Sequence, residues 1–420
     1  MADTAVEVVV RLGAEDVSAG RLWAHRRRGT ESATFSYAPE YLARGDAYEL
    51  DPALPLTAGQ QQTPTGRAIF GAFSDCAPDR WGRRLIQRDE EQRARRDAVA
   101  ERSIGEIDYL LGVRDDLRQG ALRFRNPASG AFLSEEGSGI PHLLQLGRLL
   151  DASDRMERDE AGEAELNLLL RGGSSLGGAR PKAHVLDRNG RIAIAKFPSA
   201  ANDEWDVMRW EAVALTLARR AGIRVPDSEL HVVDGKPVLV VDRFDRNADR
   251  RIGYVSAMTM LESGDGDAAS YLDIADVIER HSPNATDDLR ELWQRIAFSI
   301  LISNTDDHLR NHGFLRASTA GWSLSPAFDL NPDPRPGPKH LRTSIDYATT
   351  EPRLDALLEV AEFFRLSPAA AAGVAREVAE ATSGWRTAAE QHGLDAVGIE
   401  RMAGAFEHEQ AEAARAIATR

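Results

Sequence analysis

A polar segment in the last third of the chain carries the residue types and the spacing that phosphoryl transfer requires. It reads ISNTDDHLRN and follows an apolar pattern that predicts a helix over Leu289–Ser303. Asp306 and Asn311 are five positions apart, a spacing at which the carboxylate accepts the proton of an attacking hydroxyl and the amide holds Mg²⁺. Asp329 follows a short predicted strand, Trp322–Leu324, and adds a second oxygen ligand for the metal. These residues predict a magnesium-assisted phosphoryl-transfer site.

A lysine and a glutamate upstream fit the same chemistry. Lys196 lies in the predicted strand Ile192–Phe197, and a lysine in a buried strand is costly unless it meets an anion. Glu211 lies in the predicted helix Val207–Ala221 and supplies such an anion, as in kinases that pair a strand lysine with a helix glutamate. The alternative is a lysine on the solvent face of an edge strand.

The segment Arg171–Lys182, RGGSSLGGARPK, is rich in glycine and precedes a predicted strand. Backbone N–H groups of Gly177, Gly178 and Ala179 are suited to cradle phosphates. It is neither a Walker A loop, because no lysine follows the last glycine, nor a GxGxxG fingerprint. Pro181 also lacks an N–H group. The alternative interpretation is a flexible connection.

The order of predicted elements favours α/β plus α architecture. The first third mixes a strand over Val6–Val10 with an arginine-rich helix over Trp81–Arg96, for which Asp79 is the expected N-cap. A Gly/Ser/Pro-rich linker is expected over Asn126–Gly139. The last third is predominantly helical, and Trp322–Leu324 is the one strand indicated there. A mixed α/β lobe followed by a helical lobe suits a ligand cleft between lobes. Further strands are predicted over Ala121–Phe124, Ala183–Leu186 and Val238–Val241, and further helices over Ala356–Phe364 and Ala369–Thr382. Asn189-Gly190 predicts a hairpin turn before the strand that begins at Ile192, and Gly222 is expected to end the helix that begins at Val207.

The composition predicts a soluble, acidic protein. The chain has 420 residues, 42% hydrophobic and 28% charged, which excludes a disordered chain and favours several subdomains. Acidic residues (66) outnumber basic ones (52), so bulk attraction to nucleic acid or anionic lipid is not expected. No apolar run approaches the roughly 18 residues of a membrane span, and the N-terminus lacks a signal-peptide pattern. With a single cysteine, Cys76, we expect a cytoplasmic protein without membrane contact.

Other groups of residues in the sequence are consistent with other functions. His308 and His312 have an i, i+4 spacing that zinc sites use, although no HExxH pattern accompanies them. Asp306, Asp307, His308 and Asp329 are also a ligand set that a metal-dependent hydrolase would use. Cys76 has no accompanying His/Asn arrangement, so a buried or incidental thiol is the simpler interpretation.

Two basic clusters, Arg26–Arg28 and Arg80–Arg96, raise the question of nucleic-acid contact despite the acidic total. A solvated helix face balanced by Asp89, Glu90 and Glu91 is the favoured interpretation of the second cluster.

Taken together, these segments resemble the HipA-type toxin serine/threonine kinases of bacterial toxin–antitoxin systems. The resemblance implies a protein-kinase-like two-lobed fold with an N-terminal α/β accessory domain. Expected boundaries are 1–125 for the accessory domain, 126–165 for a linker and lead-in helix, 166–245 for the kinase N-lobe and 246–420 for the helical C-lobe. The segments that carry the resemblance are SDCAPDRWGRRL (Ser74–Leu85), GALRF (Gly120–Phe124), SSLGGARPKA (Ser174–Ala183), AIAKFPS (Ala193–Ser199), VVDRFDR (Val240–Arg246), NTDDHLRNHGF (Asn304–Phe314) and LSPAFDLNP (Leu324–Pro332).

The resemblance also implies roles for individual residues. Asp306 would be the catalytic base, and Asn311 and Asp329 the Mg²⁺ ligands. Asp307 adds a second carboxylate beside that base, and we expect this extra negative charge near Mg²⁺ to alter the metal affinity. The remaining implied roles are ATP binding by Lys196, Gly177, Gly178, Ala179, Val241, Asp242 and Phe244, pairing of Lys196 with Glu211, and autophosphorylation at Ser175 or the adjacent Ser174.

The function implied is that of a HipA-like kinase toxin that uses ATP and Mg²⁺. The resemblance suggests an aminoacyl-tRNA synthetase as protein substrate, a helix-turn-helix antitoxin as partner, and contact with DNA only through that antitoxin. Two alternatives stay open: a non-catalytic corepressor bound to an antitoxin, and a metal-dependent phosphohydrolase.

Overall fold

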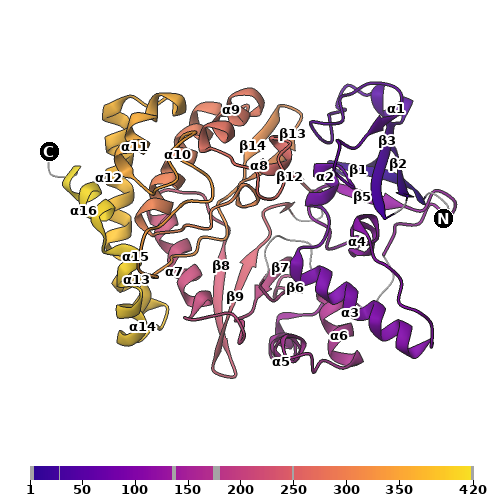
Figure 1. Ribbon diagram of the computed structural model, residues 1–420, viewed down its shortest axis with the longest axis horizontal. Coiled ribbons are helices and arrows are strands. Elements are labelled where there is room, and N and C mark those ends of the chain that lie inside the picture. Colours follow the sequence, from indigo (N-terminus) through magenta and orange to yellow (C-terminus); the bar gives the residue numbers. More distant parts are fainter. Residues whose placement is uncertain (1–3, 28, 135–138, 174–179, 248–249, 418–420) are drawn as a thin grey trace. The chain divides into compact units, whose positions relative to one another are not determined.

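The computed structural model describes residues 4–27, 29–134, 139–173, 180–247 and 250–417 (Figure 1). Its internal contacts divide the chain into two compact units. The first unit comprises Met1–Asn202 and Asp242–Val255, and the second comprises Asp203–Val241 and Ser256–Arg420. The four-part division expected from the sequence stays a prediction.

The first unit begins with an antiparallel five-stranded sheet in the order β4-β3-β2-β1-β5. Its strands are β1 (Thr4–Leu12), β2 (Glu15–Arg27), β3 (Thr30–Tyr37), β4 (Gln61–Gln62) and β5 (Leu122–Arg125). The predicted strand over Val6–Val10 is confirmed, but simple alternation is broken by an irregularity between Val8 and Val9. Val8, Val9 and Val10 are consequently all buried. The predicted strand near residue 122 supplies β5.

The helices of the first unit lie in sequence both between the strands of this sheet and after its last strand. They are α1 (Pro39–Leu42), α2 (Gly71–Asp75), α3 (Arg80–Arg96), α4 (Glu106–Gly112), the 3-10 turn η1 (Leu143–Gln145), α5 (Leu146–Glu157) and α6 (Glu163–Gly172). The predicted cap of α3 is confirmed, because Asp79 Oδ1 accepts a hydrogen bond of 2.8 Å from the N–H of Gly82. α3 packs beside α6, and α6 beside α5 (Figure 1).

A β-hairpin completes this part of the first unit. β6 (Lys182–Leu186) pairs antiparallel with β7 (Ile192–Lys196) through the predicted Asn189-Gly190 turn. Gly190 has a φ of +76°, which glycine adopts without a steric penalty. The C-terminal end of α6 lies close to β6, since a Cβ on Gly172 would stand 2.7 Å from the Cβ of Ala183. The segment 242–255 adds the small hairpin of β10 (Arg246–Asn247) and β11 (Arg250–Arg251).

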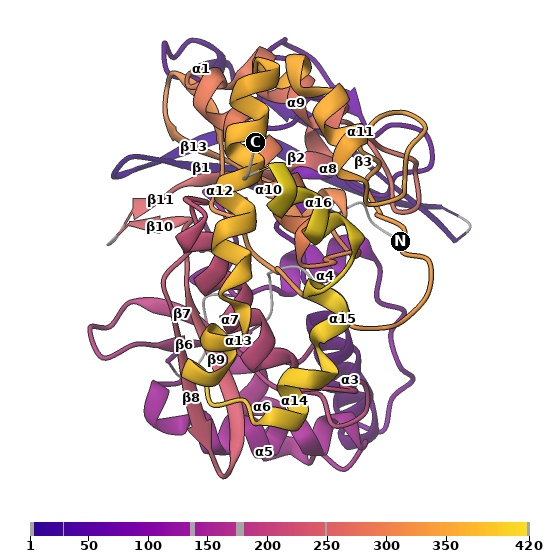
Figure 2. The same cartoon turned by 90° about the vertical axis from the view of Figure 1, so that its left-hand side faces the viewer.

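The second unit is mainly helical, as predicted. α10 (Ala285–Leu301) is buried along most of its length and packs against α9 (Tyr271–His281) and α12 (Pro368–Ser383). α16 (Glu409–Ile417) lies beside α12 (Figure 2). The predicted helix at residue 207 is α7 (Val207–Arg220). The other elements of this unit are β8 (Ser228–Val233), β9 (Lys236–Asp242), α8 (Ala257–Met260), the 3-10 turn η2 (Leu309–Asn311), β13 (Gly313–Ser318), β14 (Gly321–Leu324), α11 (Leu354–Glu359), the 3-10 turn η3 (Ala361–Phe364), α13 (Trp385–Gln391), α14 (Ala396–Arg401) and α15 (Ala403–Phe406). β12 (Gly253–Ser256) begins in the segment 242–255 of the first unit and ends at the first residue of the second.

One expectation about the last third was wrong. Trp322–Leu324 was expected to be the one strand there. It does form a strand, β14, but β14 pairs antiparallel with a second strand, β13, that was not predicted, with Phe314 opposite Leu324. The β13 sequence, GFLRAS, buries its first two residues only, so its apolar pattern is too short to distinguish a strand from a loop.

Candidate functional site

The polar segment predicted to carry the chemistry is a loop that leaves the buried helix α10 through a sharp backbone turn. Ser303 has a φ of +54° and is buried, which takes the chain out of the helical direction. The N–H of Asn304 donates to the carbonyl of Ser299 at 2.8 Å. The Asn304 side chain is buried and also contacts the Ser299 hydroxyl at 3.4 Å. The start of the loop is therefore held by the end of a rigid helix.

The structure brings Asp306 and Asn311 together. The Nδ2 group of Asn311 donates to the backbone carbonyl of Asp306 at 3.2 Å, which closes the five-residue loop. The Asp306 carboxylate points to solvent, with 76% of its side chain exposed, and its Oδ1 lies 3.5 Å from Nε of Arg342. An exposed carboxylate can meet the hydroxyl of an incoming substrate, as a catalytic base must.

Asp329 lies on a second loop that is tied to the first. It is half-buried with a φ of +58°, and its Oδ1 accepts a hydrogen bond of 3.3 Å from Nδ2 of Asn331. The N–H of Asn331 donates to Oδ1 of Asn304 at 3.4 Å, and the N–H of Asp333 donates to the carbonyl of Ser303 at 3.2 Å. The loop of the proposed base and the loop of the proposed metal ligand therefore lie against each other.

Asp307 does not add a second carboxylate to the exposed loop surface. Its side chain is buried, and its Oδ2 accepts hydrogen bonds from the Tyr271 hydroxyl at 2.7 Å and the Ser299 hydroxyl at 3.3 Å. Its Oδ1 lies 3.1 Å from Nε2 of His312, and its backbone carbonyl accepts from the Thr343 hydroxyl at 2.7 Å. Asp307 thus connects the loop to α9 and α10.

The environment of Asp307 also sets its ionisation. Burial acts to raise the pKa of Asp307, but the neighbouring His312 and the Tyr271 hydroxyl outweigh it and hold that pKa below its ordinary value. Burial and the adjacent carboxylate raise the pKa of Tyr271 well above its usual range. This pattern describes an ionised carboxylate that a neutral phenol stabilises.

The histidine spacing does not gather a zinc site in the part of the chain that the structure describes. His308 and His312 flank the 3-10 turn η2, and His312 is directed at Asp307. No group of three or more His, Cys, Asp or Glu side chains suited to a metal ion occurs among the described residues.

The lysine and glutamate of the prediction lie in separate units. Lys196 is the last residue of β7 and is half-buried. Glu211 is buried in α7, with 2% of its surface exposed. Their pairing stays a prediction.

Some of the predicted nucleotide-binding residues lie in the part of the chain that the structure describes, and the others lie outside it. Val241 and Asp242 end β9, and Oδ2 of Asp242 lies 3.2 Å from a guanidinium nitrogen of Arg191. The Phe244 ring lies 6.2 Å from the ring of Tyr254. Gly177, Gly178, Ala179, Ser174 and Ser175 lie outside the described residues.

Sequence reasoning missed a buried ionic network around the segment DRFDR. Asp245 accepts hydrogen bonds from Arg243 at 2.6 Å, from Arg246 at 2.7 Å and from the N–H of Gly120 at 2.8 Å. Burial acts to raise the pKa of Asp245, but the two guanidinium groups hold it well below its usual range. Alternating Asp and Arg directly after an apolar strand was the available signal, because such charges must pair if the chain stays buried.

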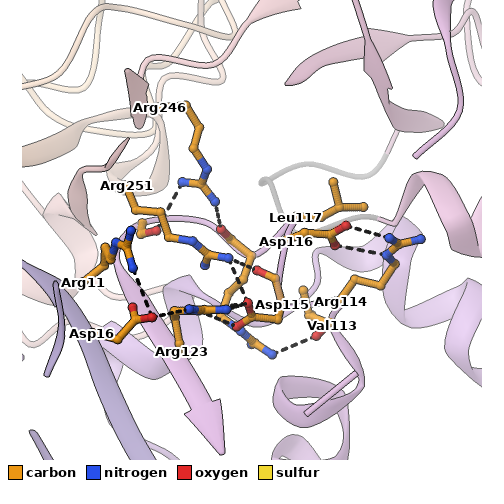
Figure 3. Close-up of polar contacts among 12 residues, drawn as sticks. Arg11, Asp16, Val113, Arg114, Asp115, Asp116, Leu117, Arg123, Arg246 and Arg251 are labelled. Atoms are coloured by element: carbon orange, nitrogen blue, oxygen red, sulfur yellow. Dashed lines mark hydrogen bonds and ion pairs between the residues drawn. The ribbon is translucent and has the colours of Figure 1, made fainter. Parts of the chain in front are cut away.

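A second carboxylate extends this network to the sheet of the first unit. Arg123 of β5 and Arg251 of β11 both contact Oδ2 of the buried Asp115, at 2.5 and 3.0 Å (Figure 3). Arg123 also reaches Asp16 at 2.7 Å. The segment that follows β9 is thereby attached to the turn 113–120 and to the N-terminal sheet.

Described arginines of both basic clusters pair with acidic neighbours; Arg28 lies outside the described residues. Arg26 lies 2.6 Å from Glu31, and Arg83 of α3 lies 2.5 Å from Glu106. Along α3, Arg93 pairs with Glu90 at 2.6 Å. These contacts favour the interpretation of α3 as a solvated, charge-balanced helix face. Other described pairs of α3 are Arg84–Asp159, Arg88–Glu91 and Arg96–Glu163.

Cys76 is unsuited to act as a nucleophile. It is buried, and burial raises the pKa of its thiol to about 12, with the positive charge of Arg118 offsetting part of that effect.

Comparison with known proteins agrees with the architecture. The family described as "HipA-like C-terminal domain" matches residues 174–385, and the "HipA N-terminal domain" matches residues 10–105. A chain of the Shewanella oneidensis toxin–antitoxin complex of HipA, HipB and operator DNA superposes with a TM-score of 0.68 at 18% identity, over 97% of this chain and 96% of that one. This likeness concerns the fold. The proinflammatory kinase CtkA of Helicobacter pylori aligns with a TM-score of 0.46 at 17% identity, over 58% of this chain and 94% of that one.

Curated relatives match part of their own length. A Haemophilus influenzae protein named "Putative kinase" is 24% identical over 38% of this chain and 52% of its own. A Sinorhizobium fredii protein, "Putative kinase Y4dM", is 29% identical over 33% and 36%. This chain therefore spans about half, or less, of these relatives.

The described residues form no helix with the length and apolar character needed to cross a bilayer. The C-terminal family match covers half of the chain and the N-terminal match most of the sheet before it, so this protein belongs to the HipA family.

Proposed function

We propose that this protein is a HipA-like serine/threonine protein kinase that transfers the γ-phosphate of ATP to a serine hydroxyl of a protein. The observation that carries the proposal is the loop of Asp306 and Asn311, closed on itself and tied to the loop of Asp329. Membership of the HipA family and the kinase names of the relatives support it.

In this proposal each residue has one role. The exposed carboxylate of Asp306 accepts the proton of the substrate hydroxyl as that oxygen attacks the γ-phosphorus, whose bond to the β–γ bridging oxygen breaks and releases ADP. Lys196 holds the ATP phosphates, and Glu211 orients Lys196. Val241, Asp242 and Phe244 contact the adenine, and the N–H groups of Gly177, Gly178 and Ala179 face the phosphates.

The donor set fits magnesium. Asn311 uses its Nδ2 group for the Asp306 carbonyl, so its amide oxygen is the atom that a cation would take. With the carboxylate of Asp329 this supplies the hard oxygen ligands that Mg²⁺ prefers. Bound Mg²⁺ would neutralise charge on the phosphates; Asn311 and Asp329 are the residues that would hold it.

The wider biological role is part of the proposal. The S. oneidensis relative is in complex with HipB and operator DNA, which supports an antitoxin partner and contact with DNA through that partner. An aminoacyl-tRNA synthetase as substrate, autophosphorylation at Ser175 or Ser174 and a cytoplasmic location follow from the family resemblance.

The test is the intact mass of purified protein, first shown to be unphosphorylated, before and after incubation with ATP and Mg²⁺. We expect one added phosphate on the wild type, mapping to Ser174 or Ser175, and none on Asp306→Asn. The matched control is Asp355→Asn, which removes another exposed carboxylate paired with an arginine in the same unit and should behave as wild type. An Asp306→Asn protein that gains phosphate at the wild-type rate would show that the base is misassigned.

Two other outcomes would favour the alternatives. Release of free phosphate without any phosphoprotein would indicate a metal-dependent phosphohydrolase. Full biological function of Asp306→Asn, with no phosphoryl transfer by the wild type to itself or to a protein, would indicate a non-catalytic corepressor.

A further inference from the structure

The lysine proposed to hold the ATP phosphates has a second lysine directly opposite it. In the register of the β6–β7 hairpin, Lys196 pairs with Lys182. Directly opposite residues of an antiparallel pair project from the same face, with Cβ atoms about 5 Å apart, and like charges in such positions repel. The hairpin thus presents two ammonium groups at one end of one face.

Lys182 is neutralised by a carboxylate from the N-terminal domain, the segment 10–105 that matches the HipA N-terminal domain. Its Nζ lies 2.5 Å from Oδ2 of Asp79, and the two side chains are only 5% and 2% exposed. The same carboxylate caps α3 through its other oxygen, which accepts from the N–H of Gly82. A buried ion pair of this kind is stable only while both partners are present, because either charge alone would be desolvated without compensation.

One further hydrogen bond joins the start of α3 to the same strand residue. The indole Nε1 of Trp81 donates to the backbone carbonyl of Lys182 at 3.0 Å. Beside it, the N–H of Phe197 donates to the carbonyl of Pro181 at 2.9 Å and closes the hairpin next to Lys196. Side chain and backbone of Lys182 are therefore both held by the segment Asp79–Trp81.

The two lysines also differ in burial. Lys182 is buried, whereas Lys196 is half-buried at the end of its strand. A lysine that serves as a point charge for phosphate needs a fixed backbone beneath its long, flexible side chain.

We infer that Asp79 and Lys182 are positioning residues for nucleotide binding: their ion pair fixes the strand opposite Lys196 and so sets where the Lys196 ammonium stands. The inference rests on the proposed function. Its consequence is that the N-terminal domain is a structural part of the nucleotide-binding lobe, so a disturbance at the start of α3 reaches the ATP phosphates through β6.

The test is a charge-balanced double variant, Asp79→Asn with Lys182→Gln, which removes the pair without changing the net charge beside Lys196. Binding of ATP in the presence of Mg²⁺ and binding of adenosine are measured by calorimetry, and the KM for ATP by kinetics. We expect ATP affinity to fall about tenfold or more, since a misplacement of about 1 Å can cost about 100-fold. Adenosine affinity should be unchanged, because adenosine carries no phosphate.

The matched control is Arg88→Gln with Glu91→Gln, which removes a 2.8 Å ion pair of the same helix away from its start and without contact to β6. It should bind ATP as the wild type does. If the double variant at Asp79 and Lys182 does not fold, Trp81→Phe removes the single hydrogen bond to Lys182 and should weaken ATP binding in the same selective way. The single variant Asp79→Glu keeps a carboxylate and its charge beside Lys182, so it should retain most of the ATP affinity of the wild type.

Wild-type ATP affinity in the double variant would overturn the inference, and so would an equal loss of ATP and adenosine binding, which indicates general damage. A wild-type protein that binds no ATP would overturn the proposed function as well. The failure of the inference and the failure of the proposed function are distinguishable, because the first is seen only when the wild-type protein binds ATP.

Discussion

The hydroxyl of Tyr271 donates a 2.7 Å hydrogen bond to the carboxylate of Asp307, the residue next to the proposed catalytic base. Tyr271 lies at the start of α9 and is fully buried. Two adjacent aspartates therefore have opposite environments: Asp306 faces solvent and Asp307 anchors the loop from beneath. An exposed base at a fixed position requires such an anchor, because a solvent loop without buried contacts loses its geometry.

Removal of this anchor should destabilise the second unit. Asp307→Ala leaves His312 and the Tyr271 hydroxyl buried without their partner and should cost about 3–5 kcal/mol of unfolding free energy. Tyr271→Phe removes one hydrogen bond to a charged group and should cost about 1.5–3 kcal/mol. Urea unfolding measures both. Tyr347→Phe, at a tyrosine that is 73% exposed, should change stability by less than about 0.5 kcal/mol. Equal effects of all three substitutions would contradict the anchoring role.

His184 should make the first unit sensitive to mild acid. Burial, reinforced by the charge of Arg243, lowers the pKa of His184 to about 3. The unfolded chain binds a proton near pH 6.5 and the folded one does not, so stability is retained above about pH 6.5 and falls as the pH drops toward 3. At pH 5 the loss should be about 2 kcal/mol. In His184→Gln, stability should fall less between pH 7 and pH 5. A slope identical to that of the wild type would refute the assignment.

The proposed metal ligands should be separable from the base by their magnesium requirement. Asn311→Ala and Asp329→Asn each remove one oxygen ligand, so the Mg²⁺ concentration for half-maximal phosphoryl transfer should rise about tenfold or more. Excess Mg²⁺ should recover part of the activity, whereas no Mg²⁺ concentration should restore Asp306→Asn. If the Mg²⁺ concentration for half-maximal transfer is unchanged in both variants, Asn311 and Asp329 are not the metal ligands.

Two neighbouring aspartates offer a test of the buried ionic network. Asp115→Asn takes one charge from a buried carboxylate that contacts Arg123 and Arg251 and should cost about 3–5 kcal/mol. Asp116→Asn breaks an equally short pair with Arg114, but that carboxylate is 44% exposed, so the cost should stay below about 1 kcal/mol (Figure 3). Chemical denaturation of the two variants measures the difference. A comparable loss of unfolding free energy in both variants would show that burial is not the reason why the Asp115 ion pairs stabilise the protein.

Several local features were predictable because they depend on neighbours in sequence. Asp79 caps α3, the Asn189-Gly190 turn joins β6 to β7, and Gly222, with its φ of +82°, follows α7. Each follows from backbone geometry that a few adjacent residues decide. The short strand β13 was missed for the opposite reason: its pairing with β14 supplies the stability that its own pattern lacks.

By itself, the sequence determined the mixed and helical halves of the chain and the loop spacing of Asp306 and Asn311, since periodicity and spacing are properties of the chain alone. Only the tertiary structure decided which charges are buried. It directed Asp307 away from Asp306 and joined Asp79 to Lys182 across 103 positions of the chain. The physical reason is that the ionisation and role of a carboxylate depend on desolvation and on partners brought from distant segments, which no local pattern records.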